Sequence, residues 1–219
     1  MKAIIFDMDG VLIDSERASL ECFKKAAKIH GVELDVDLYM STIGQNAKTC
    51  DETYMRCFKD RELLTNAKIT YKNLFKEESD NGRIPLKKGA REIIDYLKNN
   101  NYPYALATSS ARPYVEMAFI NQGYSEVPFK YIMTGDKINS SKPDPEIFIK
   151  AAEMMGVDVK DCLIVEDSLN GIKAAYNANA TSCLVPDIVK PNEEMLNKAN
   201  YIKKDLLEVL ELIKNNLVQ

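Results

Sequence analysis

Two aspartates, Asp7 and Asp9, follow a short apolar run at the start of the chain. The run, residues 3–6, is too short for a helix, and its two isoleucines are β-branched, so it predicts a strand buried on both faces. Residues i and i+2 of an extended chain point the same way, so both carboxylates can face one small volume. Gly10 then permits a sharp turn or a close approach to a ligand. Aspartates are also common turn formers, so this segment alone leaves both interpretations open.

Three further polar segments each follow an apolar run. They are Thr108-Ser109-Ser110, Ser141-Lys142-Pro143 and Glu166-Asp167-Ser168. Taken singly, each could be a helix cap or a solvated turn. Their occurrence in this order along the chain favours a shared site over three unrelated caps.

Strands and helices alternate along most of the chain and would position these segments. Strand-like runs lie at 104–108, 131–133, 162–165 and 181–185, and helical patterns at 90–99, 113–122, 146–155, 169–177, from 192 onward and at 205–216. This alternation predicts an α/β fold with a parallel, doubly wound, Rossmann-like sheet and right-handed crossovers. In such sheets ligands bind outside the carboxyl ends of the strands, so we expect the polar segments to converge there.

The segment 15–81 shows only helical patterns, the first of them beginning after Asp14 or Ser15 as a possible N-cap. We therefore expect an α/β core made of residues 1–14 and 82–219, with residues 15–81 inserted as a small all-helical cap domain. Two connections, near Asp14 and Gly82, suit a hinge that opens and closes over a site.

Four carboxylates would meet at the carboxyl edge of the sheet: Asp7, Asp9, Glu166 and Asp167. Two like charges about 4 Å apart repel by about 4 kcal/mol at an effective dielectric near 20, so the group needs a cation or protons. An all-oxygen cluster suits Mg²⁺, which keeps several waters and shares its site with phosphate. Lys142, together with the hydroxyls and amides of Thr108 and Ser109, would bind phosphate oxygens.

Composition and charge argue against several other functions. A net charge of −4 over 219 residues, with scattered basic residues, argues against a nucleic-acid partner. No apolar stretch reaches the roughly 18 residues of a membrane span, and the N-terminus lacks a signal-peptide pattern. Five cysteines without a C-x-x-C pair are expected to be reduced thiols, and a lone histidine, His30, disfavours a zinc site. We expect a cytoplasmic protein, with a monomer as the default.

The sequence resembles the haloacid dehalogenase superfamily, in the β-phosphoglucomutase-like phosphatase branch with a helical cap. The resemblance covers nearly the whole chain and rests on Asp7-x-Asp9-Gly10, Thr108, Ser141-Lys142-Pro143-x-Pro145 and Glu166-Asp167-Ser168-x-x-Gly171. It implies that Asp7 is a nucleophile that forms an aspartyl-phosphate and that Asp9 is the general acid and base. It also implies that Mg²⁺ is held by Asp7, the backbone carbonyl of Asp9, Asp167, and Glu166 directly or through water. The presence of Asp9 argues against the dehalogenase branch.

Two departures from the mutase pattern bear on the substrate. Ser19 stands where the mutase carries a histidine, and the turn Gly44-Gln45-Asn46-Ala47-Lys48 lacks the arginine that grips a distal phosphate. Lys48 could replace it only as a point charge. We therefore expect a Mg²⁺-dependent phosphatase acting on a small phosphorylated metabolite, with sugar phosphates foremost. Substrate selection is expected at Ser19, Gln45, Asn46 and Lys48.

Two alternatives stay open. A hexose-phosphate mutase would need a second phosphate grip in the cap, for which Lys48, Arg56 or Lys72 could serve. A binding or regulatory module on the same fold would bind phosphate or metal without turnover. The second alternative is weaker, because no position of the catalytic set is missing.

Overall fold

The computed structural model describes residues 1–43 and 47–217. It divides into two compact units. The core unit consists of Met1–Asp14 and Pro85–Gln219, and the helical unit consists of Ser15–Ile84.

The core unit is built on a six-stranded sheet, in which every pair of neighbouring strands is parallel. The strands are β1 (Ala3–Phe6), β2 (Tyr104–Thr108), β3 (Tyr131–Thr134), β4 (Cys162–Glu166), β5 (Thr181–Leu184) and β6 (Tyr201–Ile202). They lie in the order β3-β2-β1-β4-β5-β6, so the direction of winding changes between β1 and β4. This is the doubly wound arrangement that the sequence predicts, and ligands bind at such a switch point.

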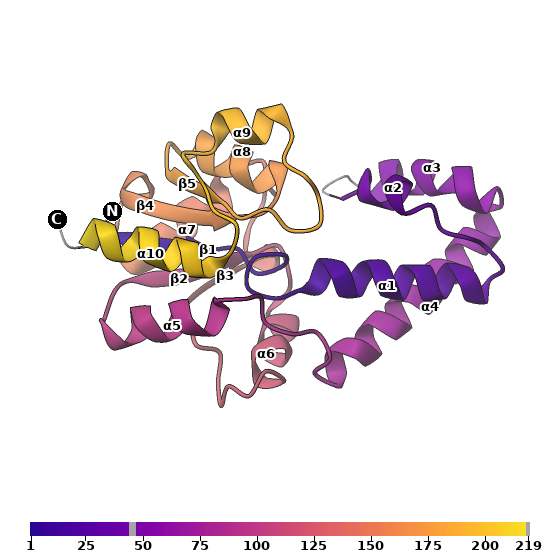
Figure 1. Cartoon of the computed structure of the whole chain (residues 1–219), viewed down its shortest axis with the longest axis horizontal. Helices are drawn as coiled ribbons and strands as arrows, with labels where there is room; N and C mark the ends of the chain where they lie inside the picture. The colour runs from indigo at the N-terminus through magenta and orange to yellow at the C-terminus, as the bar shows by residue number, and fades with distance from the viewer. Residues whose placement is uncertain (44–46, 218–219) are drawn as a thin grey trace. The chain divides into compact units, whose positions relative to one another are not determined.

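Helices cover both faces of this sheet (Figure 1). They are α5 (Ala90–Asn99), α6 (Arg112–Ile120), α7 (Glu146–Met155), α8 (Leu169–Asn177), α9 (Glu193–Lys198) and α10 (Leu206–Leu217), with 3₁₀ turns at Gly135–Lys137 and Val159–Asp161. Alternate strand residues, such as Ile5 and Ile164, pack against α7 and α8. The intervening residue Phe6 faces the other way, and its ring lies against Phe129. Two apolar layers therefore enclose the sheet.

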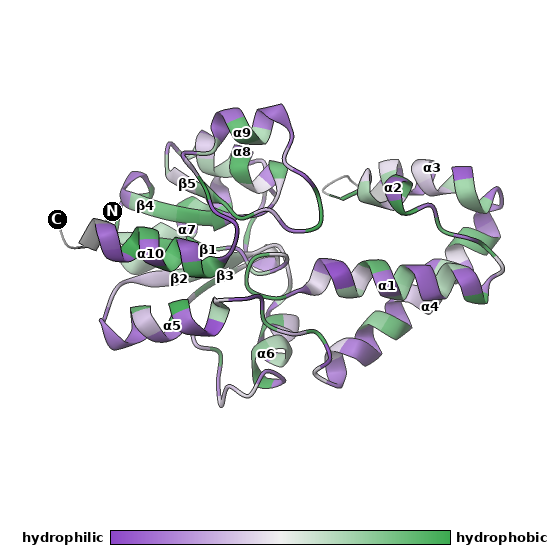
Figure 2. Cartoon of the chain, viewed as in Figure 1, coloured by the Kyte–Doolittle hydropathy of each residue, from purple (hydrophilic) through white to green (hydrophobic). Residues whose placement is uncertain are grey.

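Strand β1 lies at the centre of the sheet, with β2 on one side and β4 on the other. All four of its residues are fully buried, as expected for a strand covered on both faces. Strand β4 is similarly apolar, which Figure 2 shows as green along the strand. The register pairs Phe6 with Leu106 on β2 and with Val165 on β4. The residues that follow these three positions therefore emerge side by side at the carboxyl edge.

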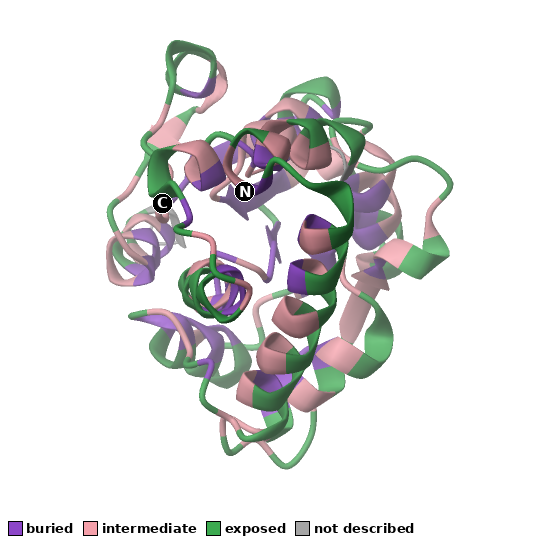
Figure 3. Ribbon diagram, turned by 90° about the vertical axis from the view of Figure 1, so that its right-hand side faces the viewer, coloured by how far each residue is buried: buried purple, intermediate pink, exposed green. Residues whose placement is uncertain are grey.

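The helical unit contains α1 (Ser15–Ile29), α2 (Val36–Met40), α3 (Ala47–Phe58) and α4 (Arg61–Asp80). Phe23 on α1 lies at the centre of its core, with ring centroids 4.8 Å from Tyr54 and 5.4 Å from Tyr71. Helices in Figure 3 carry buried and half-buried residues along one side and exposed residues along the other. Among the residues that the structure describes, no helix combines the length and the apolar character needed to cross a bilayer.

The two connections that leave the core unit run side by side within it. The amide of Asp14 donates to the carbonyl of Pro85 at 2.9 Å, and the amide of Lys87 donates to the carbonyl of Leu12 at 2.8 Å. An antiparallel bridge joins Ile13 to Leu86 between these two bonds. Backbone bonds therefore tie the outgoing and returning chain together at the point where the insertion begins and ends.

Candidate active site

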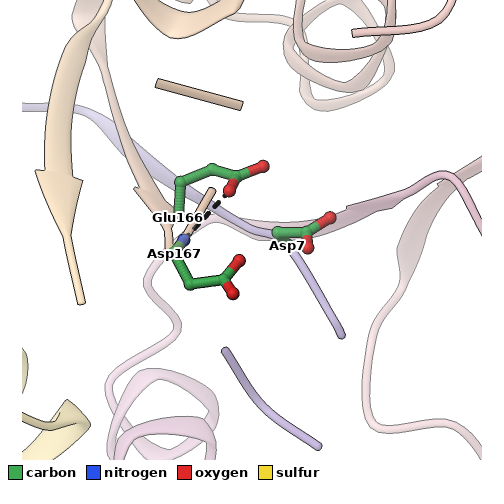
Figure 4. A group of neighbouring side chains, drawn as sticks. All are labelled: Asp7, Glu166 and Asp167. Atoms are coloured by element: carbon green, nitrogen blue, oxygen red, sulfur yellow. Dashed lines mark hydrogen bonds between the residues drawn. The ribbon is translucent and has the colours of Figure 1, made fainter. Parts of the chain in front are cut away.

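Three carboxylates from two neighbouring strand ends form the centre of the site. Asp7 follows β1, and Glu166 and Asp167 lie at the end of β4 (Figure 4). The amide of Asp7 donates to the carbonyl of Val165 at 3.0 Å, which extends the ladder between the two strands by one step. One oxygen from each carboxylate lies within 4.8 Å of the others. Three of the four carboxylates that were expected to meet at this edge are therefore grouped in the core unit.

Lys142 joins two of these carboxylates. Its Nζ lies 2.6 Å from Asp7 Oδ1 and 2.6 Å from Glu166 Oε1, with only 9% of the lysine side chain exposed. The loop that carries Lys142 is anchored by Glu146, the first residue of α7, whose carboxylate accepts hydrogen bonds from the amides of Asn139 and Ser140. The ammonium is thus held between β1 and β4 from a loop that follows β3.

Glu166 is fully buried, and both of its oxygens are engaged by the protein. Oε1 accepts from Lys142, and Oε2 accepts from the amides of Asp167 and Ser168 and from the hydroxyl of Ser168. A Cβ at Gly171 would lie 1.8 Å from the carboxylate carbon, so the first turn of α8 can pack here only with a glycine. The carboxylate of Glu166 is therefore fixed from three sides.

Charge is poorly balanced at this edge. The pKa of Asp7 is raised from 3.8 to about 7: burial is the largest cause, Lys142 opposes the shift, and the charges of Glu166 and Asp9 add to it. Burial alone would lower the pKa of Lys142, but the two carboxylates raise it overall, so this ammonium stays charged. One ammonium faces several carboxylates, and their oxygen donors are those that a hard divalent cation prefers. The donor set therefore fits a hard divalent cation.

Gly10 allows Asp167 to approach the loop after β1. The φ angle of Gly10 is +75°, a backbone conformation that residues with a side chain rarely adopt. A Cβ at this position would lie 2.2 Å from Asp167 Oδ2. The sequence led us to expect a sharp turn at Gly10 or a close approach to a ligand. In the structure, Gly10 lies close to the carboxylate of Asp167.

Asp9 and Thr108 are linked through Ser110. The hydroxyl of Ser110 donates to Asp9 Oδ2 at 2.7 Å, and its amide donates to Thr108 Oγ1 at 3.0 Å. Thr108 is fully buried at the end of β2, and Ser109 is exposed. Sequence reasoning named Thr108 and Ser109 but gave no role to Ser110. Its place in the same polar segment as Thr108 and Ser109, directly after an apolar run, was the available signal.

Residues 4–185 match the family described as haloacid dehalogenase-like hydrolases. The chain belongs to this family. It is 30% identical over 180 residues to the phosphorylated carbohydrates phosphatase of Thermotoga maritima, an alignment that covers 81% of this chain and 82% of the relative. The predicted superfamily, its β-phosphoglucomutase-like branch and the assignment as a hydrolase are confirmed.

Two further similarities extend over nearly the whole chain. A solved hydrolase of the same family from Entamoeba histolytica has a TM-score of 0.77 and 28% identity, and covers 98% of this chain and 100% of that one. The bifunctional riboflavin kinase/FMN phosphatase of Arabidopsis thaliana is 28% identical over 94% of this chain. The chain spans 54% of that longer relative, so it corresponds to only one part of it.

The predicted specificity residues of this haloacid dehalogenase-like hydrolase belong to the helical unit. The hydroxyl of Ser19 lies 2.7 Å from that of Tyr39 and 2.8 Å from that of Tyr71, so it is part of a hydroxyl network inside the unit. Lys48 is exposed on α3. Gln45 and Asn46 lie outside the described residues, and their role in selection stays a prediction.

Proposed function

We propose that this hydrolase is a Mg²⁺-dependent phosphatase of small phosphate monoesters, with sugar phosphates foremost. The observation that carries the proposal is the buried ammonium of Lys142 on Asp7 Oδ1, beside Glu166 and Asp167. This arrangement suits a carboxylate nucleophile next to a phosphate and cation site. Relatives support the substrate class: one is named a phosphorylated carbohydrates phosphatase, and another, 29% identical, a validoxylamine A 7'-phosphate phosphatase.

The reaction would proceed in two transfers through Asp7. In the first, Oδ2 of Asp7 attacks phosphorus and the bond from phosphorus to the ester oxygen breaks, while Asp9 gives its proton to that oxygen. In the second, water attacks the phosphorus of the aspartyl-phosphate, Asp9 takes the water proton, and the Asp7–phosphorus bond breaks. Splitting the transfer replaces one difficult step by two easier ones. Lys142 would hold the Asp7 carboxylate through Oδ1, so that the opposite oxygen faces the phosphate.

The donor set fits Mg²⁺, and its ligands would be Asp7, Asp167 and the backbone carbonyl of Asp9. Bound there, Mg²⁺ would offset negative charge on the transferring phosphoryl group. Glu166 would act through a water, because its oxygens already accept four hydrogen bonds from Lys142, Asp167 and Ser168. Its role would be to hold Lys142 and the Asp167 backbone.

Phosphate oxygens would be bound by Lys142, Thr108 and Ser109. The Thr108 hydroxyl oxygen accepts from the Ser110 amide, which directs its own proton away from that loop and makes it a donor for phosphate. Backbone amides after β2 would add donors of the kind that stabilise developing negative charge. We assign substrate selection to the helical unit as the cap, within the predicted bounds 15–81, and a cytoplasmic monomer remains our expectation.

The test is phosphate release with Mg²⁺ across a panel of sugar phosphates, including β-glucose 1-phosphate with and without a bisphosphate primer. We expect release from at least one ester, loss of release in EDTA, and loss in Asp7→Asn. Asp161→Asn is the matched control, since Asp161 pairs with exposed Lys2 before β4, and it should keep wild-type activity. Glucose 6-phosphate formation without net phosphate release would instead identify the mutase. Full activity in a pure Asp7→Asn sample would refute the proposal that Asp7 is the nucleophile.

A further inference from the structure

Ser110 contacts the carboxylate of Asp9 in a way that the proposed reaction does not yet use. Its Oγ donates a hydrogen bond to Asp9 Oδ2 at 2.7 Å. Both side chains are half-buried, so this bond is partly shielded from competing water. Oδ2 of Asp9 can accept this hydrogen bond whether or not Oδ1 carries a proton. The contact therefore holds the carboxyl in one orientation in both protonation states.

Ser110 is itself held in place by two other strand ends. Its amide donates to Thr108 Oγ1 at 3.0 Å, and its carbonyl accepts from the amide of Gly135 at 3.3 Å. A Cβ at Gly135 would lie 2.2 Å from the carbonyl oxygen of Ser109, so the turn after β3 packs directly against this loop. Ser110 is thus positioned by the Thr108 hydroxyl at the end of β2 and by the backbone that follows β3.

We propose that Ser110 is the positioning residue for the general acid of this enzyme. By holding Oδ2, it fixes the rotation of the Asp9 carboxyl and leaves Oδ1 as the oxygen that carries and delivers the proton. In that step the proton moves from Asp9 Oδ1 to the ester oxygen as the phosphorus–oxygen bond breaks and the Asp7–phosphorus bond forms. Ser110 loses no atom, and no further reactant is needed. The inference rests on the proposed phosphatase function.

A comparison of two substrates with different leaving groups shows whether Ser110 positions the acid or has only a structural or phosphate-binding role. A sugar alkoxide is a poor leaving group and needs the proton of Asp9, whereas p-nitrophenolate leaves without one. Misplacing Asp9 should therefore slow the first transfer from a sugar phosphate and spare that from p-nitrophenyl phosphate. Loss of a phosphate contact, or a distorted loop, would slow both, because the phosphoryl group is the same.

The experiment compares kcat/KM, which reports the first transfer, for p-nitrophenyl phosphate and for the sugar phosphate of the panel that is hydrolysed fastest. For Ser110→Ala we expect a fall of about tenfold or more on the sugar phosphate and less than about twofold on the aryl ester. Ser110→Thr keeps the hydroxyl and should restore most of the sugar-phosphate rate. Ser125→Ala removes an exposed hydroxyl from the segment after α6 and should leave both rates unchanged.

A double-mutant cycle tests whether Ser110 acts through Asp9. Once Asp9→Asn has removed the acid, adding Ser110→Ala should cost the sugar phosphate nothing more, since residues in one network are not additive. Equal losses on both esters in Ser110→Ala, or additive losses in the double variant, would overturn the inference while leaving the phosphatase intact. A wild-type protein that releases phosphate from no ester would overturn both.

Discussion

Replacing Lys142 by Met should destabilise the core unit in a pH-dependent way. The ammonium is nine-tenths buried between Asp7 and Glu166, and methionine keeps the length of the side chain without its charge. The carboxylate oxygens lie within 4.8 Å of one another, so two ionised groups repel by at least about 3.5 kcal/mol at an effective dielectric of 20. This agrees with the roughly 3–5 kcal/mol that breaking a buried pair costs.

The sign of the pH dependence follows from Asp7. Its pKa is already raised to about 7, and removal of the opposing ammonium raises it further. At pH 5.5 the carboxyl is protonated in both proteins, so most of the repulsion is absent. At pH 8 the Asp7 carboxyl is ionised in the wild type. In the variant, the same carboxyl either keeps its proton, at a cost in free energy, or ionises and repels Glu166. The stability difference between the two proteins should therefore grow as the pH rises from 5.5 to 8.

The assay is urea unfolding of metal-free protein at pH 5.5 and pH 8, with Lys2→Met as the control. Lys2 pairs with Asp161 at the surface, with 69% of its side chain exposed, so its loss should be small and similar at the two pH values. A Lys142→Met loss that is large but equal at both pH values would mean that packing, and not charge, dominates at this position. That result would refute the electrostatic reasoning.

Three more predictions concern the same site and the helical unit. Binding of Mg²⁺, measured by calorimetry, should weaken by about tenfold per pH unit below pH 7, since it displaces the proton that the raised pKa of Asp7 retains. Gly171→Ala should lower stability in thermal melts by about 1–3 kcal/mol and reduce turnover, because its Cβ would overlap Glu166; unchanged melting would contradict the packing. Phe23→Ala should cost about 3–5 kcal/mol of stability by emptying the aromatic centre of the helical unit, and a loss below 1 kcal/mol in urea would contradict that role.

The sequence was most informative where apolar runs are long enough to carry a period. Strand β1 and the helix 90–99 appear at their predicted bounds, because burial on two faces or on one helical face leaves a clear pattern. Strand β6 was not predicted. It has only two residues, Tyr201 and Ile202, and forms because β5 offers a free edge, which is a tertiary cause that no local pattern records.

The grouping of three carboxylates could be predicted from the sequence, but their bonding to neighbouring groups could not. Strand-end placement sufficed to bring Asp7, Glu166 and Asp167 together. Strand-end placement could not predict that the oxygens of Glu166 accept hydrogen bonds from Lys142, from the Ser168 hydroxyl and from two backbone amides. These bonds depend on side-chain rotamers and on the turn into α8. The bond from Ser110 to Asp9 was missed for the same reason: it joins loops 101 residues apart in the chain.

The measurement that tests the central claim most directly uses Asp9→Asn with p-nitrophenyl phosphate and Mg²⁺. The aryl ester needs no acid to phosphorylate Asp7, but the resulting aspartyl-phosphate needs Asp9 as the base for its hydrolysis. We predict a burst of p-nitrophenolate equal to the enzyme concentration, followed by slow turnover, with one phosphoryl group on the peptide that contains Asp7 after acid quench and mass spectrometry. Linear release without a burst and with Asp7 unmodified, no release at all, or a phosphoryl group on another residue would contradict the account.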